Sequence, residues 1–284
     1  METKFPIVGI GASAGGLEAY ESFFKAMPAD NGMAFVLVSH LDPTHISLLP
    51  ELISKQTKMK VLQVEDGQKL LPDHVYVIPP NKNLNILNGS LYLLQLPRSR
   101  GLNLPIDNFF RSLAQDQGSN AIAIILSGTG TDGTLGLKEI KGEMGMVMVQ
   151  DETSAKYDGM PRSAIATGLA DYILPVDKMP NQIMKYIGHA DPQAKTILNL
   201  EEDKFQKALH KIFILLRSQT QHDFSNYKTN TICRRIEMRM HVHQIDDIDT
   251  YVRYLQNNGK EIQTLFKDLL IGVTGFFRDP EAFE

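Results

Sequence analysis

The chain has 284 residues, of which 43% are hydrophobic and 22% charged, and these ordinary values predict a packed core and favour two domains. The formal net charge of -4 argues against nucleic acid as the main partner, and the single cysteine excludes an internal disulfide. No apolar run reaches the ~20 residues that span a bilayer, so we expect a cytoplasmic protein without membrane insertion.

The first segment predicts a strand, a tight turn and a helix. Glycines break the apolar run 7–10, and apolar residues then recur at helical spacing from Leu17 to Met27. Residues 11–15 fit the pattern G-x-S-x-G, which exposes Ser13 beside a helix N-terminus. Residues 9–14 also fit the looser dinucleotide pattern G-x-G-x-x-G/A, so a nucleotide-binding oxidoreductase is an alternative. A dinucleotide site prefers an acidic residue at the end of the next strand, where His40 stands instead.

Further along the chain, short apolar strands alternate with amphipathic helices. We predict strands at 33–38, 61–64, 75–78, 84–87, 91–94, 121–126, 145–149 and 172–174, and helices at 46–54, 105–117, 162–167 and 177–187. The dipeptide Asn88-Gly89 indicates a type I′ hairpin between two of these strands. The predicted fold class is therefore α/β, with a doubly wound, mostly parallel sheet that has an antiparallel hairpin edge.

The last third of the chain has a different character. We predict a first domain at 1–190, a turn-forming and charged linker at 191–203, and a small all-α domain at 204–284. The predicted helices of the second domain are 205–218, 229–240, 248–256 and 262–270.

Three predicted strands end close to a serine, a histidine and an aspartate. Ser13, His40 and Asp132 are all expected at one edge of the sheet, because parallel strands end on the same side. Together they suit acyl transfer, with Ser13 as nucleophile, His40 as base and Asp132 as the group that orients the imidazole. The backbone amides of Ala14 and Thr129, in glycine-rich turns, are candidate oxyanion donors.

Each of these residues also has a purely structural interpretation. Ser13 and Asp132 occupy positions where side chains often cap the following helix, and His40 alone is compatible with an ordinary hydrogen-bonded residue. His40 and His45 are spaced like a metal pair, but Pro43 prevents a helix between them and no cysteine or glutamate cluster completes a ligand set. We therefore expect no metal site.

Read together, four segments resemble the catalytic domain of the chemotaxis receptor methylesterases, CheB. They are Ile10-Gly-Ala-Ser13-Ala-Gly-Gly16, Ser39-His-Leu-Asp-Pro43, Leu126-Ser-Gly-Thr-Gly-Thr-Asp132-Gly133, and the stretch from Gln150 to Arg162. The resemblance, over roughly residues 5–190, implies hydrolysis of glutamyl methyl esters on receptor helices, without a cofactor, and deamidation of receptor glutamines. It also implies that Ser13, His40 and Asp132 are the catalytic residues.

The chain departs from that family in three respects. Ala14 stands where the family often has threonine, and Thr129 where it often has methionine beside the oxyanion. The esterase motif begins within the first ten residues, so we expect no receiver domain before it and no control by phosphorylation of one within this chain. An inactive receptor-binding module is a further alternative, since no residue excludes it.

The helical tail resembles the N-terminal domain of the CheR receptor methyltransferases, through residues 223–240 and 268–280. The resemblance implies that a basic helix faces the receptor, where Arg235 and Arg239, one turn apart, are candidates for partner binding. A solvated helix face is the alternative. Thr274 and Arg278 match part of the S-adenosylmethionine site of that family. Because the sheet domain that would hold most of this cofactor does not follow, we expect neither S-adenosylmethionine binding nor methyltransferase activity outside a longer chain.

Overall fold

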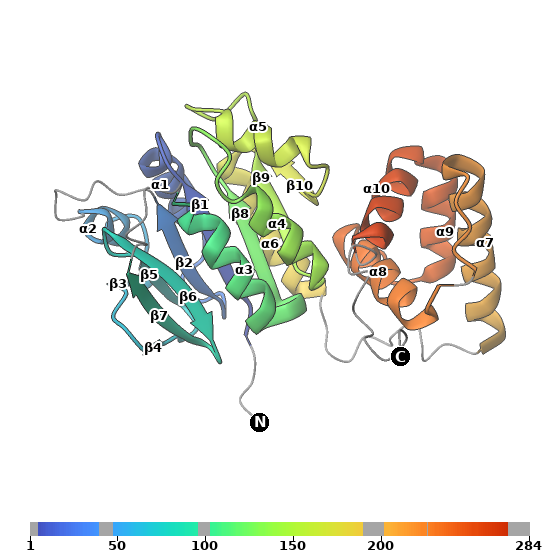
Figure 1. The fold of residues 1–284 in the computed structure, drawn as a ribbon, viewed down its shortest axis with the longest axis horizontal. Helices are drawn as coiled ribbons and strands as arrows, with labels where there is room; N and C mark the ends of the chain where they lie inside the picture. Colours follow the sequence, from blue (N-terminus) through green and yellow to red (C-terminus); the bar gives the residue numbers. More distant parts are fainter. Residues whose placement is uncertain (1–4, 40–47, 96–102, 190–201, 226, 272–284) are drawn as a thin grey trace, which may run out of the picture. The chain divides into compact units, whose positions relative to one another are not determined.

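The computed structural model describes residues 5–39, 48–95, 103–189, 202–225 and 227–271 (Figure 1). The chain divides into two compact units, Met1–Met184 and Lys185–Glu284, which we describe separately. Most of the predicted linker, 191–203, lies outside the described residues, so its bounds stay a prediction.

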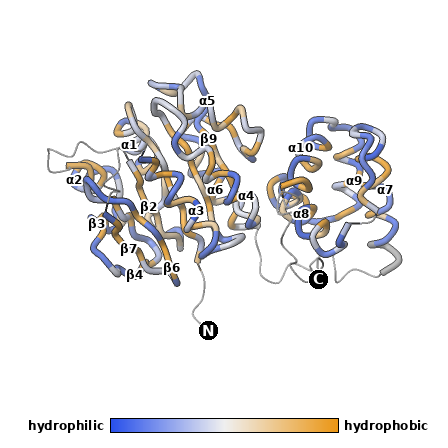
Figure 2. The backbone as a smooth tube through the Cα atoms, in the orientation of Figure 1, coloured by the Kyte–Doolittle hydropathy of each residue, from blue (hydrophilic) through white to orange (hydrophobic). Residues whose placement is uncertain are grey.

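The first unit is organised around a seven-stranded sheet in which every pairing is parallel. Its strands, in spatial order, are β10 (Tyr172–Leu174), β9 (Met146–Gln150), β8 (Ala121–Ile125), β1 (Ile7–Ala12), β2 (Ala34–Ser39), β5 (His74–Val77) and β3 (Lys60–Gln63). The inner strands are near-continuous apolar runs because both faces of the sheet are covered. Figure 2 shows this hydrophobic character along β2 and β9.

Helices cover both faces of this sheet. They are α1 (Gly16–Ala26), α2 (Leu49–Ser54), α3 (Pro105–Gln117), α4 (Thr134–Gly142), α5 (Gly159–Ala166) and α6 (Met179–His189), with single 3-10 turns at Gly118–Asn120 and Val176–Lys178. The apolar side chains of α3 and α4 join one core cluster, while Phe23 and Phe24 of α1 contact Phe35 on the other face of β2. The predicted α/β class is confirmed.

The predicted hairpin forms β6 (Lys82–Leu87) and β7 (Ser90–Gln95), and its turn has φ 51° at Asn88 and 69° at Gly89. Positive φ at both positions is what a type I′ turn requires. The hairpin pairs with β4 (Gln68–Lys69) in a separate three-stranded sheet and does not extend the edge of the main sheet. The hydroxyl of Ser112 in α3 accepts the Ile86 N–H at 3.1 Å, so this small sheet is anchored to α3.

The second unit contains α7 (Glu202–Thr220), α8 (Thr229–Val242), α9 (Ile248–Asn257) and α10 (Gly259–Leu270). Their apolar faces enclose one core, which includes Ile236, Tyr251 and Leu265. Side chains cap two of the helices, since Asp247 accepts the Thr250 N–H and Asn258 accepts the Glu261 N–H. In the part of the chain that the structure describes, none of the helices combines the length and the apolar character that a bilayer crossing needs.

Candidate active site

The turn after β1 presents Ser13 at the start of α1. Ser13 is partly buried, and its carbonyl accepts the Gly16 N–H at 2.9 Å. The N-cap residue of α1 is Gly15, at φ 71°, and no side chain caps this helix. Ser13 is therefore not a capping residue, and among the described residues its hydroxyl has no hydrogen-bond partner. The N-terminus of a helix carries partial positive charge, so this position stabilises negative charge that develops near the Ser13 hydroxyl.

The glycines before Ser13 are explained by packing. A Cβ on Gly9 would lie 3.0 Å from side-chain atoms of Phe109, and one on Gly11 would lie 2.5 Å from Ile106 Cγ2. Both contacts are tighter than side chains normally make, so β1 needs glycine where α3 crosses it. The glycine pattern that suggested a dinucleotide site thus has a structural cause that involves no ligand.

Asp132 is 4% exposed and is held at the N-terminus of α3. Its carboxylate accepts N–H groups of Ile106 and Asp107, each at 3.0 Å, and that of Gly133 at 2.8 Å. The structural alternative for Asp132 was a cap on the helix that follows it, but the carboxylate instead satisfies first-turn N–H groups of α3. These donors fix the orientation of the carboxylate.

The loops that carry Ser13 and Asp132 meet at the carboxyl edge of the sheet. The Ser13 N–H donates to the carbonyl of Ser127 at 3.0 Å, and a Cβ on Gly128 would lie 3.1 Å from that of Ser13. The structure therefore brings Ser13 against the β8–α4 turn that leads to Asp132. His40 and His45 lie outside the described residues, so the base of the predicted triad stays a prediction. No group of metal-ligating side chains occurs within the described ranges.

Two backbone N–H groups beside Ser13 remain available for an oxyanion. The N–H groups of Ala14 and Thr129 have no acceptor among the described residues. The neighbouring Gly128 N–H, in contrast, donates to the Tyr157 carbonyl at 2.9 Å. The two predicted donors thus differ from Gly128, whose N–H is already engaged.

Ser127 and Gln150 were missed by the sequence reasoning. Ser127 is 1% exposed, directly after β8, and its N–H donates to Oε1 of the buried Gln150 at 2.8 Å. Its hydroxyl donates to the Ala14 carbonyl at 2.9 Å and accepts the Tyr157 N–H at 3.0 Å. The signal in the sequence is position alone, because Ser127 and Gln150 both stand at strand ends on the edge where Ser13 lies.

A second buried carboxylate, Asp107, lies next to Asp132. Its Oδ1 accepts the Gly136 N–H at 2.7 Å, whereas Oδ2 has no hydrogen-bond partner among the described residues. Burial raises the pKa of Asp107 above its ordinary value of 3.8, and the charge of Asp132 raises it further, against the lowering effect of the Gly136 N–H. Asp107 therefore binds a proton more tightly in the folded than in the unfolded chain.

This shift predicts a pH-dependent effect of Asp107→Asn. A carboxyl group whose pKa is raised by folding contributes stability below its unfolded pKa, and this contribution is lost as the pH rises through the folded value. The free energy of unfolding of Asp107→Asn should therefore increase relative to wild type as the pH rises above about 4. Denaturant unfolding of both proteins between pH 3.5 and 7 measures this difference, and a difference that stays constant with pH would contradict the shift.

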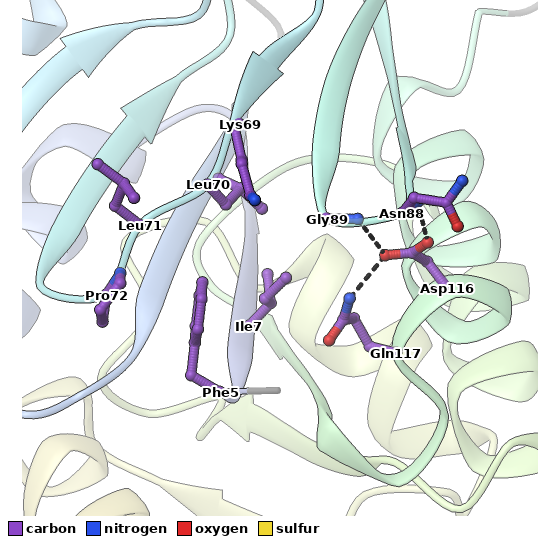
Figure 3. A pocket seen from close by; sticks show the side chains of 10 residues that line it. All are labelled: Phe5, Ile7, Lys69, Leu70, Leu71, Pro72, Asn88, Gly89, Asp116 and Gln117. Atoms are coloured by element: carbon purple, nitrogen blue, oxygen red, sulfur yellow. Dashed lines mark hydrogen bonds between the residues drawn. The ribbon is translucent and has the colours of Figure 1, made fainter. Parts of the chain in front are cut away.

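Within the described residues, one pocket lies near each end of strand β1. A pocket of about 470 Å³ is lined by Phe5, Ile7, Leu71, Asp116 and Gln117 among others, and Figure 3 shows Asp116 bonded to Gln117 and to the hairpin turn. Because Ile7 begins β1, this pocket lies about 20 Å along the strand from Ser13. It is therefore separate from the candidate active site.

The smaller pocket, of about 180 Å³, borders the Ser13 turn. Its lining includes Gly15, Ser127 and Gln150. Glu18 and Lys156 also line this pocket, and they form an exposed ion pair with each other. The hydrogen bond from Lys156 lowers the pKa of Glu18. This pocket thus borders the turn that carries the candidate nucleophile and has both polar and apolar residues in its wall.

In the helical unit, the prediction that Arg235 and Arg239 are available for partner binding is wrong. Arg235 and Arg239 are 5% and 3% exposed, so they do not form an exposed basic face of the helix. Arg239 instead makes a bidentate pair with Glu261, at 2.8 Å from both Nε and Nη2. Spacing along one helix shows that two arginines share a face, but it does not show that a carboxylate from a later helix covers that face. Thr274 and Arg278 lie outside the described residues.

Comparisons with known proteins match both units. Residues 8–183 match the family model of the CheB methylesterase, and residues 207–270 match that of the CheR methyltransferase all-alpha domain. An uncharacterized 104.1 kDa protein of Rhodobacter capsulatus is 37% identical over 255 residues, which are 83% of this chain and 27% of that protein. A protein-glutamate methylesterase/protein-glutamine glutaminase of Geobacter metallireducens is 35% identical over 186 residues, 64% of this chain and 51% of the relative.

A solved structure agrees with these matches. The crystal structure of the Thermotoga maritima CheB methylesterase catalytic domain is similar with a TM-score of 0.59 and 31% identity, covering 64% of this chain and 98% of that domain. The chain spans about half the length of the methylesterases that it matches.

Proposed function

The chain belongs to the CheB methylesterase family, and on that premise we propose that it hydrolyses glutamyl methyl esters on chemotaxis-type receptors by a Ser-His-Asp mechanism. The observation that carries the proposal is the placement of Ser13, whose hydroxyl does not cap α1. Ser13 lies against the β8–α4 turn, and this turn leads to Asp132, whose carboxylate is anchored by backbone N–H groups. The relatives named protein-glutamate methylesterase/protein-glutamine glutaminase support the choice of a glutamyl substrate.

In the proposed reaction, Ser13 Oγ attacks the ester carbonyl while His40 takes its proton. The tetrahedral oxyanion is stabilised by the N–H groups of Ala14 and Thr129, and Asp132 orients the imidazole. Collapse of this intermediate breaks the ester C–O bond, and His40 returns the proton to the departing methanol. A water molecule, deprotonated by His40, then hydrolyses the acyl-enzyme, which leaves a glutamate and the free serine.

The same steps deamidate glutamine, with ammonia as the leaving group. None of these steps requires a cofactor. We further propose that the chain acts in the cytoplasm on the helices of methyl-accepting receptors, and that S-adenosylmethionine is bound only in a longer chain that supplies the rest of that site.

Methanol release tests this function directly. The full chain is incubated with a peptide that carries a glutamate γ-methyl ester, and methanol is measured against time. We expect saturable release at a rate far above spontaneous hydrolysis, with one glutamate formed per methanol. A chain that binds the peptide without releasing methanol would instead indicate the inactive binding module.

A further inference from the structure

One buried side chain joins three loops at the carboxyl edge of the sheet. Ser127 follows β8, its hydroxyl donates to the Ala14 carbonyl, and the same oxygen accepts the Tyr157 N–H from the β9–α5 loop. The backbone N–H of Ser127 donates to Gln150 at the end of β9. Both donors of this residue, and one acceptor site of its hydroxyl, are thus directed to segments from other parts of the chain.

Two hydrogen bonds to Ser127 hold the peptide units on either side of the Ser13–Ala14 peptide. The peptide that joins Ala12 to Ser13 is held through the Ser13 N–H, which donates to the Ser127 carbonyl at 3.0 Å. The peptide that joins Ala14 to Gly15 is held through the Ala14 carbonyl, which accepts the Ser127 hydroxyl at 2.9 Å. The peptide between them is held by the Gly16 N–H on the Ser13 carbonyl. A change in the backbone dihedral angles of Ser13 therefore requires at least one of these bonds to break.

The close fit of the turn leaves little room for another arrangement. A Cβ on Gly15 would lie 2.7 Å from Ser127 Oγ and 3.1 Å from Cδ2 of Tyr157. Glycine at this position lets the turn approach the hydroxyl, and its φ of 71° is one that other residues rarely adopt. The geometry of the turn and the position of Ser127 thus depend on each other.

We propose that Ser127 is a positioning residue for the reaction, whose hydroxyl, through its bond to the Ala14 carbonyl, restrains the backbone that carries Ser13 and the Ala14 N–H. This inference rests on the proposed function. Because Ser127 is 1% exposed, its proposed role does not require contact with the substrate. It acts by holding the nucleophile and an oxyanion donor in register, and a displacement of about 1 Å in such groups costs on the order of 100-fold in rate. Since it acts after binding, it affects kcat and leaves KM nearly unchanged.

The variant Ser127→Ala tests the proposal, with Ser112→Ala as a matched control. The Ser112 hydroxyl also accepts one N–H, from Ile86, and donates to one carbonyl, that of Phe109. It therefore makes the same two kinds of bond at a place that does not touch the Ser13 turn. With the γ-methyl ester peptide, we expect Ser127→Ala to lose roughly 10- to 100-fold in kcat with KM within about twofold, and Ser112→Ala to retain kcat within about twofold.

A second measurement does not depend on activity. Amide hydrogen exchange of the full chain is followed at Ser13 and Gly16, and we expect faster exchange there in Ser127→Ala but not in Ser112→Ala. Wild-type kcat in Ser127→Ala, equal losses in both variants, or a loss confined to KM would overturn the proposal. If the wild-type chain releases no methanol, the proposed function fails, and the exchange rates alone decide whether Ser127 holds the turn. Should Ser127→Ala not fold, Ser127→Cys keeps a side chain of similar shape but weakens both hydrogen bonds of the hydroxyl. We expect the same loss of kcat in that variant, and wild-type kcat there would overturn the proposal.

Discussion

Replacing Ser13 with alanine is expected to lower kcat for methyl ester hydrolysis by about 10⁴- to 10⁶-fold. The covalent step requires the serine oxygen, and the remaining amide donors and bound substrate support only slow hydrolysis. Ser13 neither caps α1 nor donates its hydroxyl to another described residue, so its removal should leave the fold intact. Methanol release from the γ-methyl ester peptide measures the loss, and the melting temperature verifies the fold.

The matched control is Ser218→Ala in α7, an exposed serine whose hydroxyl donates to the Leu215 carbonyl. We expect its turnover to equal that of wild type. Turnover of Ser13→Ala within tenfold of wild type would contradict the nucleophile assignment. The double variant Ser13→Ala/His40→Ala adds a sharper comparison, because residues that act as one unit show little further loss when a second is removed. A large additional loss would place His40 outside that unit.

The second large effect is expected in the helical unit, where Glu261→Gln should lower the free energy of unfolding by about 3–5 kcal/mol. Oε1 of Glu261 accepts the Arg239 Nε–H and the Tyr251 hydroxyl, at 2.8 and 2.9 Å. Oε2 lies 2.8 Å from Arg239 Nη2 and 2.7 Å from His243 Nε2. Glutamine removes the negative charge and turns an N–H₂ group towards one pair of donors, so the buried guanidinium loses its main partner.

The pH dependence of this network follows from the same contacts. Burial by itself would raise the pKa of Glu261, but the hydrogen bonds and charges of His243 and Arg239 lower it from 4.5 to about 2. A carboxylate whose pKa is lowered by folding contributes stability above its unfolded pKa, and this contribution is lost as the pH falls from 4.5 towards 2. The Glu261→Gln variant should therefore lose less stability than wild type across that range.

Native-state hydrogen exchange of the full chain at α8 and α10 locates the effect, and calorimetry at pH 7 and pH 3 gives its size. The control is Asp246→Asn, which alters an exposed carboxylate of the same unit and should change stability by less than about 1 kcal/mol. Equal stability of Glu261→Gln and wild type would show that the buried Arg239 side chain does not need the Glu261 carboxylate as its partner.

Several elements follow from local sequence because their causes are local. The apolar runs of β1 and β8 predict buried parallel strands, since only a sheet covered on both faces accepts them. Asn88-Gly89 predicts the hairpin turn because these residues adopt positive φ at low cost. Ser13 and Asp132 could be assigned to one edge of the sheet because parallel strands end on the same side.

Other features depend on partners that periodicity does not reveal. The burial of Arg239 requires Glu261, which belongs to another helix, and the glycines of β1 are required by α3. The amino-acid sequence alone determined the class of fold and the set of candidate catalytic groups, because backbone preferences and the alternation of apolar residues are local properties of the chain. Only the tertiary structure decided that Asp132 caps α3 and that Ser127 holds the Ser13 turn, because a buried polar group takes its role from whichever distant donor or acceptor replaces water around it.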